Sequence, residues 1–310
     1  MSEANDRLQH HLIRILIYGL ALVPRRVMAR IAIPLGSLWY RIDRHHRAIA
    51  TDNMSRAFHG EVDAADIPGR VKANFIQLTT AALEMPSLLK LNRDNLDTYV
   101  TFSGSQHLKA ALSRGKGVLF LSAHLGNWEL MALATALKFD FQCHLLVRPL
   151  DFSPMDRVLT DIRCRTGNKV LDKIRSAGVI RKLLGENEVL GMMLDQSASW
   201  YDGVYVPFFG RTACTHKGFG LFALRYDPTV LPLFNIRQAD GRYKITFDPP
   251  VTLQRSGNVN RDLLENTAAF NRIIEKHIRM APDNWLWVHR RWRPKEIPTS
   301  ARKKMAALSL

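Results

Sequence analysis

The sequence predicts an α/β protein in which a mostly parallel or mixed central sheet is flanked by helices and preceded by N-terminal membrane-associated helices. From about residue 98 onward, short apolar runs alternate with amphipathic segments, which is the order of strands and helices in a mostly parallel sheet. The chain has 310 residues, 46% of them hydrophobic, and is long enough to bury one large core. We expect N-terminal helices over residues 1–44, a main domain over 45–293 and a basic tail over 294–310.

The first 44 residues combine apolar runs with arginines. Residues 12–23 are apolar except for Arg14, and this run is shorter than the ~20 residues that a helix needs to cross the hydrocarbon core. Residues 27–42 carry Trp39 and Tyr40 among several arginines, a combination typical of helices that lie in the membrane interface. We therefore expect this segment to bind an anionic membrane surface. The alternative is that both helices pack on the core and expose their arginines to solvent.

The remaining chain divides into a helical region and an alternating region. Residues 45–90 have a helical pattern that Pro68 and Pro86 interrupt. The later segments are expected, in chain order, as a strand at 98–104, a helix at 105–115, a strand at 117–124, a helix at 127–137, a strand at 143–148, a helix at 154–166, a strand at 188–194, a helix at 217–226, strands at 229–237 and 242–247, and a helix at 260–280.

The charge of the chain restricts its partners. Lys and Arg total 44 against 28 acidic residues, and the resulting net charge of +16 attracts polyanions. We expect no nucleic acid partner, because the sequence has no helix-turn-helix, zinc-finger or RNP pattern. We also expect no metal, because the sequence has neither an HExxH motif nor a Cys/His cluster with ligand spacing. An anionic membrane and a phosphorylated substrate therefore remain as the expected partners of this positive charge.

The segment HLGNWE at residues 124–129 places a histidine and a carboxylate at a strand-to-helix junction. His124 ends the strand, Asn127 is a natural N-cap, and Glu129 lies in the first helical turn. Because His124 lies in the turn, we expect the chain to fold the Glu129 carboxylate back onto the imidazole. A carboxylate on one ring nitrogen makes the other nitrogen a better base for a substrate hydroxyl, an effect of roughly 10² to 10⁴ in rate. The alternative is a structural histidine beside a nearby acid, since this spacing is common by chance.

The complete string HLGNWE resembles the His-x4-acid motif of the lipid A biosynthesis late acyltransferases, a branch of the wider glycerolipid acyltransferases. Further segments follow in the order of that family and together cover about residues 10–293. They are NMSRAF at 53–58, Arg148 after a strand, Arg163 and Arg165 before Gly167, Asp195 and Gln196 after a strand, VPFFG at 206–210, and HRRW at 289–292.

This resemblance implies a glycerolipid acyltransferase-like fold with the acyltransferase domain over 45–293. It also implies that His124 is the general base and that Glu129 is its orienting partner. The residues expected to bind substrate or support the site are Asn127, Arg148, Arg163, Asp195 and Gln196. For Arg163 and Asp195, a structural ion pair is the alternative, because such pairs perturb pKa values without catalysing a reaction.

The implied reaction moves a fatty acyl group from acyl carrier protein to a hydroxyl of a lipid A precursor. It needs no cofactor, since the acyl thioester is a co-substrate. The expected partners are acyl carrier protein, a phosphorylated glycolipid acceptor and the cytoplasmic face of the inner membrane, where the protein is peripheral or N-terminally anchored. Two alternatives stay open: the same chemistry with an acyl-coenzyme A donor and a lysophospholipid or other glycolipid acceptor, and a non-catalytic membrane-binding protein.

Overall fold

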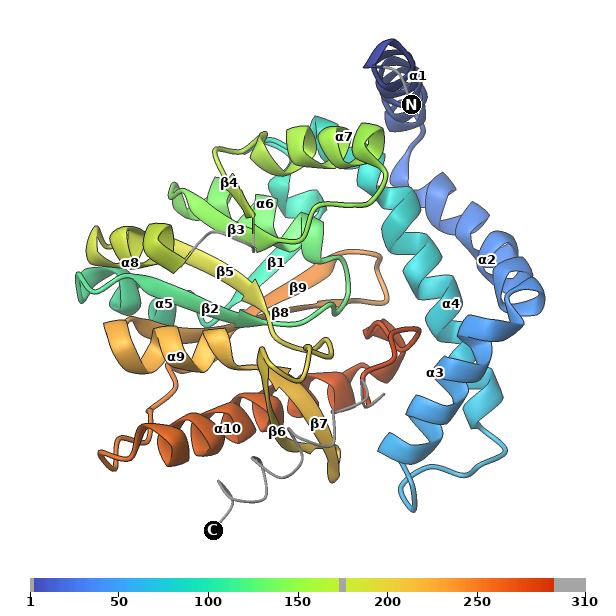
Figure 1. Ribbon diagram of the computed structural model, residues 1–310. Coiled ribbons are helices and arrows are strands. Elements are labelled where there is room, and N and C mark those ends of the chain that lie inside the picture. The colour runs from blue at the N-terminus through green and yellow to red at the C-terminus, as the bar shows by residue number, and fades with distance from the viewer. Residues whose placement is uncertain (1–2, 173–176, 293–310) are drawn as a thin grey trace.

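A seven-stranded sheet forms the centre of the computed structural model, which describes residues 3–172 and 177–292 (Figure 1). Its strands are β1 (Val100–Ser103), β2 (Val118–Ser122), β3 (Cys143–Val147), β4 (Lys169–Asp172), β5 (Val189–Met193), β8 (Thr229–Arg237) and β9 (Tyr243–Phe247). They lie in the order β1-β9-β8-β2-β5-β3-β4, and every neighbouring pair is parallel except β8 and β9. The predicted α/β fold with a mostly parallel or mixed sheet is confirmed.

Helices cover both faces of this sheet and divide the hydrophobic core in two. One face carries α5 (Ser105–Ser113), α6 (Trp128–Phe139) and α7 (Ser153–Cys164), and the other carries α8 (Ala177–Gly185), α9 (Lys217–Tyr226) and α10 (Val259–Met280). In β2, Val118 and Phe120 belong to the first half of the core, whereas Leu119 and Leu121 belong to the second. Because both faces are covered, β2 is apolar along its length instead of alternating with polar residues.

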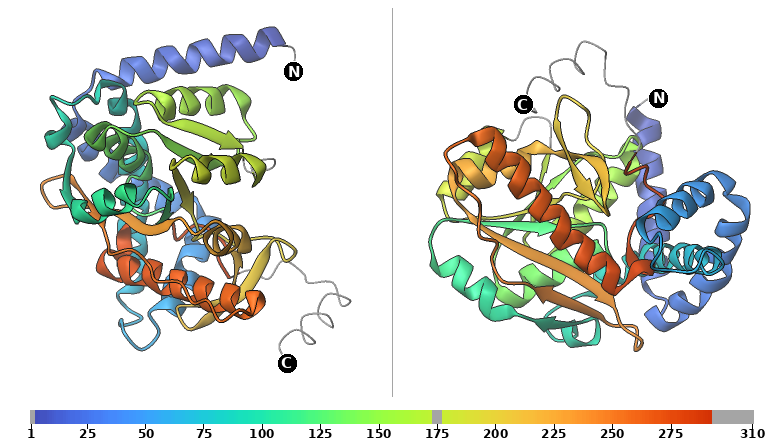
Figure 2. Two further views of the ribbon diagram at one scale, coloured as in Figure 1. Left: turned by 90° about the vertical axis from the view of Figure 1, so that its left-hand side faces the viewer. Right: turned by 90° about the horizontal axis from the view of Figure 1, so that it is seen from below.

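Four α-helices precede the sheet in the described part of the chain: α1 (Glu3–Ala21), α2 (Arg25–Ile42), α3 (Arg44–Ala57) and α4 (Ile67–Glu84). Helices α2, α3 and α4 pack together beside the sheet, and α1 lies along α7 (Figures 1 and 2). Gly36 permits the close contact of α2 with α4, because a Cβ at this position would lie 2.6 Å from Ile76 Cα. The predicted N-terminal helices are therefore confirmed as helices.

The first two helices present apolar side chains to solvent. In α1, Ile15 and Leu16 are 70% and 60% exposed, and Ile42 at the end of α2 is 69% exposed. Of the helices that the structure describes, none combines the length and the apolar character needed to cross a membrane. The association of these helices with a membrane stays a prediction.

Parts of the chain differ from the sequence prediction, and one predicted segment lies outside the described residues. Pro68, expected to interrupt a helix, lies in the first turn of α4, where a missing N–H breaks no intrahelical hydrogen bond. Residues 203–216 form a separate antiparallel hairpin of β6 (Gly203–Phe208) and β7 (Arg211–His216), which the sequence pattern does not predict. The predicted basic tail over 294–310 lies outside the described residues.

Candidate active site

The turn between β2 and α6 carries His124. Gly126 has a φ of +66°, and a Cβ there would lie 2.6 Å from the Asn235 backbone oxygen, so this position requires glycine. Asn127 caps α6, because its side-chain oxygen accepts a hydrogen bond from the Leu130 backbone N–H at 3.0 Å. The strand ends and the helix begins within this short turn, which places His124 at the carboxyl end of β2, where α/β folds bind their ligands.

The segment that follows α10 holds this turn in place. The backbone N–H of Leu286 donates to the carbonyl oxygen of His124 at 3.1 Å. The side-chain amide of Asn53, in α3, donates to the carbonyl oxygens of Trp287 and His289 at 2.9 Å and 2.8 Å. Asn53 belongs to the NMSRAF segment and is buried. The NMSRAF segment therefore supports the site indirectly: Asn53 anchors residues 287–289, and the neighbouring Leu286 holds the His124 backbone.

His124 is paired with Asp195, which lies just beyond the end of β5. Nδ1 of the ring lies 2.8 Å from Oδ1 of the carboxylate, and the His124 backbone N–H donates to Oδ2 at 3.0 Å. The Asp195 side chain has no exposed surface, whereas 21% of the His124 side chain is exposed. Within residues 3–172 and 177–292, no group is hydrogen-bonded to Nε2 of His124. The carboxylate thus fixes the ring and leaves Nε2 for a substrate.

A third residue completes the surroundings of the Asp195 carboxylate. The indole N–H of Trp285 donates to Oδ2 at 2.7 Å, and Trp285 is fully buried. Burial by itself would raise the pKa of Asp195, but the charge and hydrogen bonds of His124, together with the Trp285 indole, lower this pKa to about 2. Asp195 is therefore an anion at neutral pH and stabilises a positive charge on the His124 ring.

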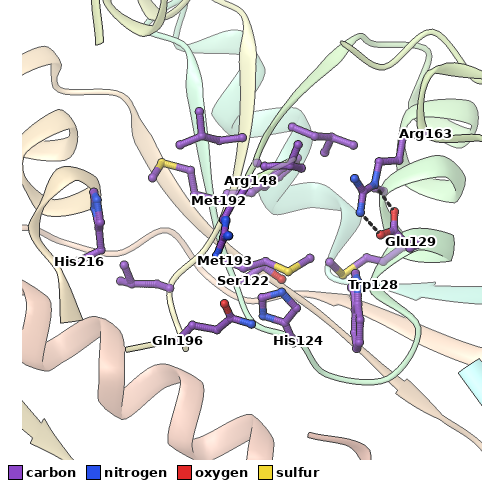
Figure 3. Close-up of a pocket in the computed structure, with 18 of the residues that line it drawn as sticks. Ser122, His124, Trp128, Glu129, Arg148, Arg163, Met192, Met193, Gln196 and His216 are labelled. Atoms are coloured by element: carbon purple, nitrogen blue, oxygen red, sulfur yellow. Dashed lines mark hydrogen bonds and ion pairs between the residues drawn. The ribbon is translucent and has the colours of Figure 1, made fainter. Parts of the chain in front are cut away.

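Glu129 forms no hydrogen bond or ion pair with His124, so the prediction that its carboxylate folds back onto the imidazole is wrong. Its carboxylate instead receives two hydrogen bonds from Arg163, at 2.8 Å to Nε and 2.5 Å to Nη2 (Figure 3). The reason is geometric: α6 begins at Trp128 and turns Glu129 towards α7, which carries Arg163. Burial opposes the charge of the guanidinium, yet the bonds to Glu129 raise the pKa of Arg163 above its usual value.

A cavity of about 920 Å³ opens beside His124, between the sheet and helices α6 and α7 (Figure 3). Its inner wall is apolar and includes Phe120, Met131, Phe141, Leu145, Leu159 and Leu233. Its polar lining includes Gln196, which lies beside His124 in Figure 3, and Arg148, His216 and Arg290. The site can therefore hold a long apolar group inside and an anionic group outside, with the histidine between them.

The structure places the predicted substrate-binding residues in different situations. Arg148, Gln196 and Arg163 line the cavity, and Arg148 is largely exposed and ion-paired with Asp151. Asp195 lies behind His124 and does not line the cavity. Asn127 does not line it either, because its side chain is used to cap α6. No cluster of three or more potential metal ligands occurs among the described residues.

From the sequence, no role was predicted for two buried residues near Asp195. Trp285 carried no motif signal, since its partner Asp195 is distant in the chain. Arg291, in the HRRW segment, is fully buried and donates to the Cys214 carbonyl at 2.7 Å and to the Thr215 hydroxyl at 2.6 Å. Burial lowers the pKa of Arg291 to about 10, although the nearby Asp195 charge opposes this shift. Arg291 thus ties the β6–β7 hairpin to the chain beside Asp195.

Known proteins resemble this chain over most of its length. A family model described as bacterial lipid A biosynthesis acyltransferase matches residues 5–294. The chain belongs to this family. Among its relatives, the lipid A biosynthesis lauroyltransferase of Escherichia coli (strain K12) is 26% identical over 284 residues, covering 89% of each chain. The lipid A biosynthesis palmitoleoyltransferase of the same organism is 22% identical over 285 residues, covering 90% of this chain and 89% of the relative.

As a lipid A biosynthesis acyltransferase, the protein is an enzyme that transfers acyl groups. The whole site described above, from Asn53 to Arg291, lies within the matched residues. A lipid A biosynthesis acyltransferase of Haemophilus influenzae is 30% identical over 152 residues, covering 47% of this chain and 46% of the relative. The two Escherichia coli relatives are named for different acyl groups, so membership of the family leaves the acyl group of this acyltransferase to be determined.

Proposed function

We propose that this acyltransferase moves a fatty acyl group from the thioester of acyl carrier protein to a hydroxyl of a lipid A precursor. One observation carries the proposal: His124, oriented by the buried Asp195, stands where an apolar cavity meets a polar mouth. His124 acts as the general base, and Asp195 takes the orienting role that the sequence assigned to Glu129. Glu129 and Arg163 instead form part of the cavity wall.

The proposed chemistry uses the Nε2 atom of His124. Nε2 takes the proton of the acceptor hydroxyl while the oxygen attacks the thioester carbonyl carbon, which forms the new C–O bond. Collapse of the tetrahedral intermediate breaks the C–S bond, and the protonated His124 returns the proton to the departing thiolate. The Asp195 anion stabilises the imidazolium between these two steps, since it is bonded to Nδ1. The products are an ester and a free thiol, and the enzyme is unchanged.

The two substrates fit different parts of the site. The acyl chain is apolar and occupies the cavity beneath α6, where its burial is favourable by about 0.8 kcal/mol for each CH₂. The acceptor is phosphorylated and approaches the mouth, where Arg290 supplies positive charge and Arg148 can exchange its exposed partner Asp151 for a phosphate. The overall charge of +16 further favours two anionic partners, the glycolipid and an acidic carrier protein.

The membrane surface is part of the same proposal. We place α1 and α2 at the cytoplasmic face of the inner membrane, where exposed residues such as Ile15 and Leu16 enter the interface and neighbouring arginines meet anionic headgroups. The enzyme would then be peripheral and would take its lipid acceptor directly from the bilayer.

The test is transfer of a labelled acyl group from acyl carrier protein to a phosphorylated, tetra-acylated disaccharide lipid by the detergent-purified enzyme. Wild type is compared with His124→Ala and Asp195→Asn. Loss of turnover by a factor of ~10² or more in both variants supports the proposal. Full activity of His124→Ala would overturn the mechanism. Transfer only from acyl-coenzyme A, or only to a lysophospholipid, would favour the second candidate, which uses the same site.

A further inference from the structure

Gly191 occupies the middle of β5, at the floor of the cavity. Strand β5 lies between β2 and β3 in the centre of the sheet, where a glycine weakens the strand because it has no side chain to pack. Gly191 nevertheless retains exposed surface, whereas its neighbour Leu190 is fully buried. A glycine at such a position marks a place where another group approaches the backbone closely.

The pairing of the strands shows what a side chain at this position would meet. Gly191 pairs with Phe120 of β2 on one side and with Leu145 of β3 on the other. Both of these residues line the cavity, and paired residues of neighbouring strands point to the same face of a sheet. Because Gly191 has no side chain, it leaves a small hollow in the cavity lining that Leu145 Cδ2 and Cys143 Sγ border.

This hollow lies far from the reacting atoms. Gly191 is level with Phe120, which lies two residues, or roughly 7 Å, before the end of β2 at Ser122, and the turn that carries His124 lies beyond that end. The two side chains nearest to this hollow, Leu145 and Cys143, are uncharged, since burial raises the pKa of the Cys143 thiol to about 12. A group that reaches this depth from a thioester at His124 must be the distal part of the acyl chain.

We propose that Gly191 sets the length of the acyl chain that the enzyme accepts, by leaving the floor of the cavity open to the end of the chain. This inference rests on the proposed function, because it takes the cavity to hold the acyl group of the donor. Family membership leaves the length of the acyl chain open, since two relatives are named for different acyl groups. The proposal assigns this property to one residue.

A methyl group at Gly191 is small enough to preserve the fold. An added Cβ would lie 3.3 Å from Cδ2 of Leu145 and 3.4 Å from Sγ of Cys143, so the neighbours need to move by only a few tenths of an ångström. The methyl group would fill space that the end of a long chain requires. One methylene in an apolar pocket changes discrimination by about 10-fold to 100-fold, so Gly191→Ala is a sensitive test of chain length.

The experiment measures kcat/KM for acyl carrier protein charged separately with decanoyl, dodecanoyl, tetradecanoyl and hexadecanoyl chains, with the phosphorylated tetra-acylated disaccharide lipid as acceptor. For Gly191→Ala we expect the ratio of shorter to longer donors to rise by about 10-fold or more. For Leu145→Ala, which enlarges the same hollow, we expect the ratio to move the other way. Leu190→Met, on the opposite face of β5, is the matched control and keeps the wild-type ratio.

The outcomes separate this inference from the function on which it rests. An unchanged donor ratio in folded Gly191→Ala, or an equal loss for every donor, would overturn the role of Gly191 while wild-type transfer still supports the proposed function. Absence of transfer by wild type from all four donors would overturn the proposed function and, with it, this inference. Opposite shifts in Gly191→Ala and Leu145→Ala would support it even if one variant is partly unstable.

Discussion

Glu129 is bound by both arms of the Arg163 guanidinium and makes no hydrogen bond to His124, five residues before it in the same motif. The pair is largely buried, with 8% of the Glu129 side chain and 14% of the Arg163 side chain exposed. Removal of one partner leaves a charge without its counter-charge in a poorly solvated place, which is costly. The two carboxylates near His124 therefore have different tasks, and substitutions separate them.

We expect Glu129→Gln to destabilise the protein by roughly 3 kcal/mol, because it leaves the Arg163 charge buried and unpaired. The double variant Glu129→Gln with Arg163→Met should recover part of this loss, since it removes both charges. Denaturant unfolding of the two single variants and the double variant measures this coupling. If the loss in the double variant equals the sum of the losses in Glu129→Gln and Arg163→Met, the ion pair does not contribute to stability in the way described here.

Asp195→Asn should act on turnover instead. An asparagine cannot stabilise the imidazolium, so we expect kcat to fall by ~10² or more while KM for the acyl donor changes little. Asp195 does not line the cavity, which is why substrate binding should be retained. Steady-state kinetics at neutral pH check this expectation. A large rise in KM with unchanged kcat would instead assign Asp195 to substrate binding.

The low pKa of Asp195 also predicts a pH dependence of stability. The carboxyl has a pKa of about 2 in the folded protein and 3.8 as its ordinary value, so the unfolded chain binds the proton more tightly. The stabilisation, about 2 kcal/mol, is present above pH ~4 and is lost as the pH falls to ~2. We therefore expect the difference in unfolding free energy between wild type and Asp195→Asn to shrink over this window. A constant difference would contradict the assigned pKa.

The sequence was sufficient to predict the fold class and the place of His124 at the end of a strand, but not the partner of that histidine. His124 and Glu129 lie in one short segment, HLGNWE, so a local pattern suggests that they interact. Asp195 is 71 residues from His124, and no local pattern links the two. These two meet because β2 and β5 are adjacent and parallel, so both end at the same edge of the sheet. The order of strands in a sheet does not follow from local patterns. The same limit applies to Trp285, which reaches Asp195 from the far end of the chain.

Trp285 offers a milder perturbation of the same carboxylate. Trp285→Phe removes the indole N–H that donates to Asp195, so the pKa of Asp195 should rise and kcat should fall by roughly 10-fold. Trp287→Phe is the matched control, because Trp287 is also fully buried but donates to the backbone carbonyl of Pro282. We expect the two variants to lose similar amounts of stability, and Trp285→Phe to lose more turnover than Trp287→Phe. Equal turnover in both variants would remove Trp285 from the catalytic group.

The exposed apolar residues of α1 predict membrane binding that depends on individual side chains. Ile15 and Leu16 are 70% and 60% exposed, so their replacement by Asp should leave the melting temperature nearly unchanged. In the membrane-bound state, each replacement loses apolar burial and places a negative charge near anionic headgroups. We expect the double variant Ile15→Asp with Leu16→Asp to bind vesicles containing anionic lipid about 10-fold or more weakly in a flotation assay.

The control for this experiment is Met280→Asp, at the end of α10, where an equally exposed apolar residue lies away from α1 and α2. It should bind vesicles as wild type does, because a general change of charge by one unit is small against the net charge of +16. High ionic strength should weaken wild-type binding without abolishing it, since the apolar contribution is not screened by salt. Equal binding by wild type and the α1 double variant would exclude this helix as the membrane contact.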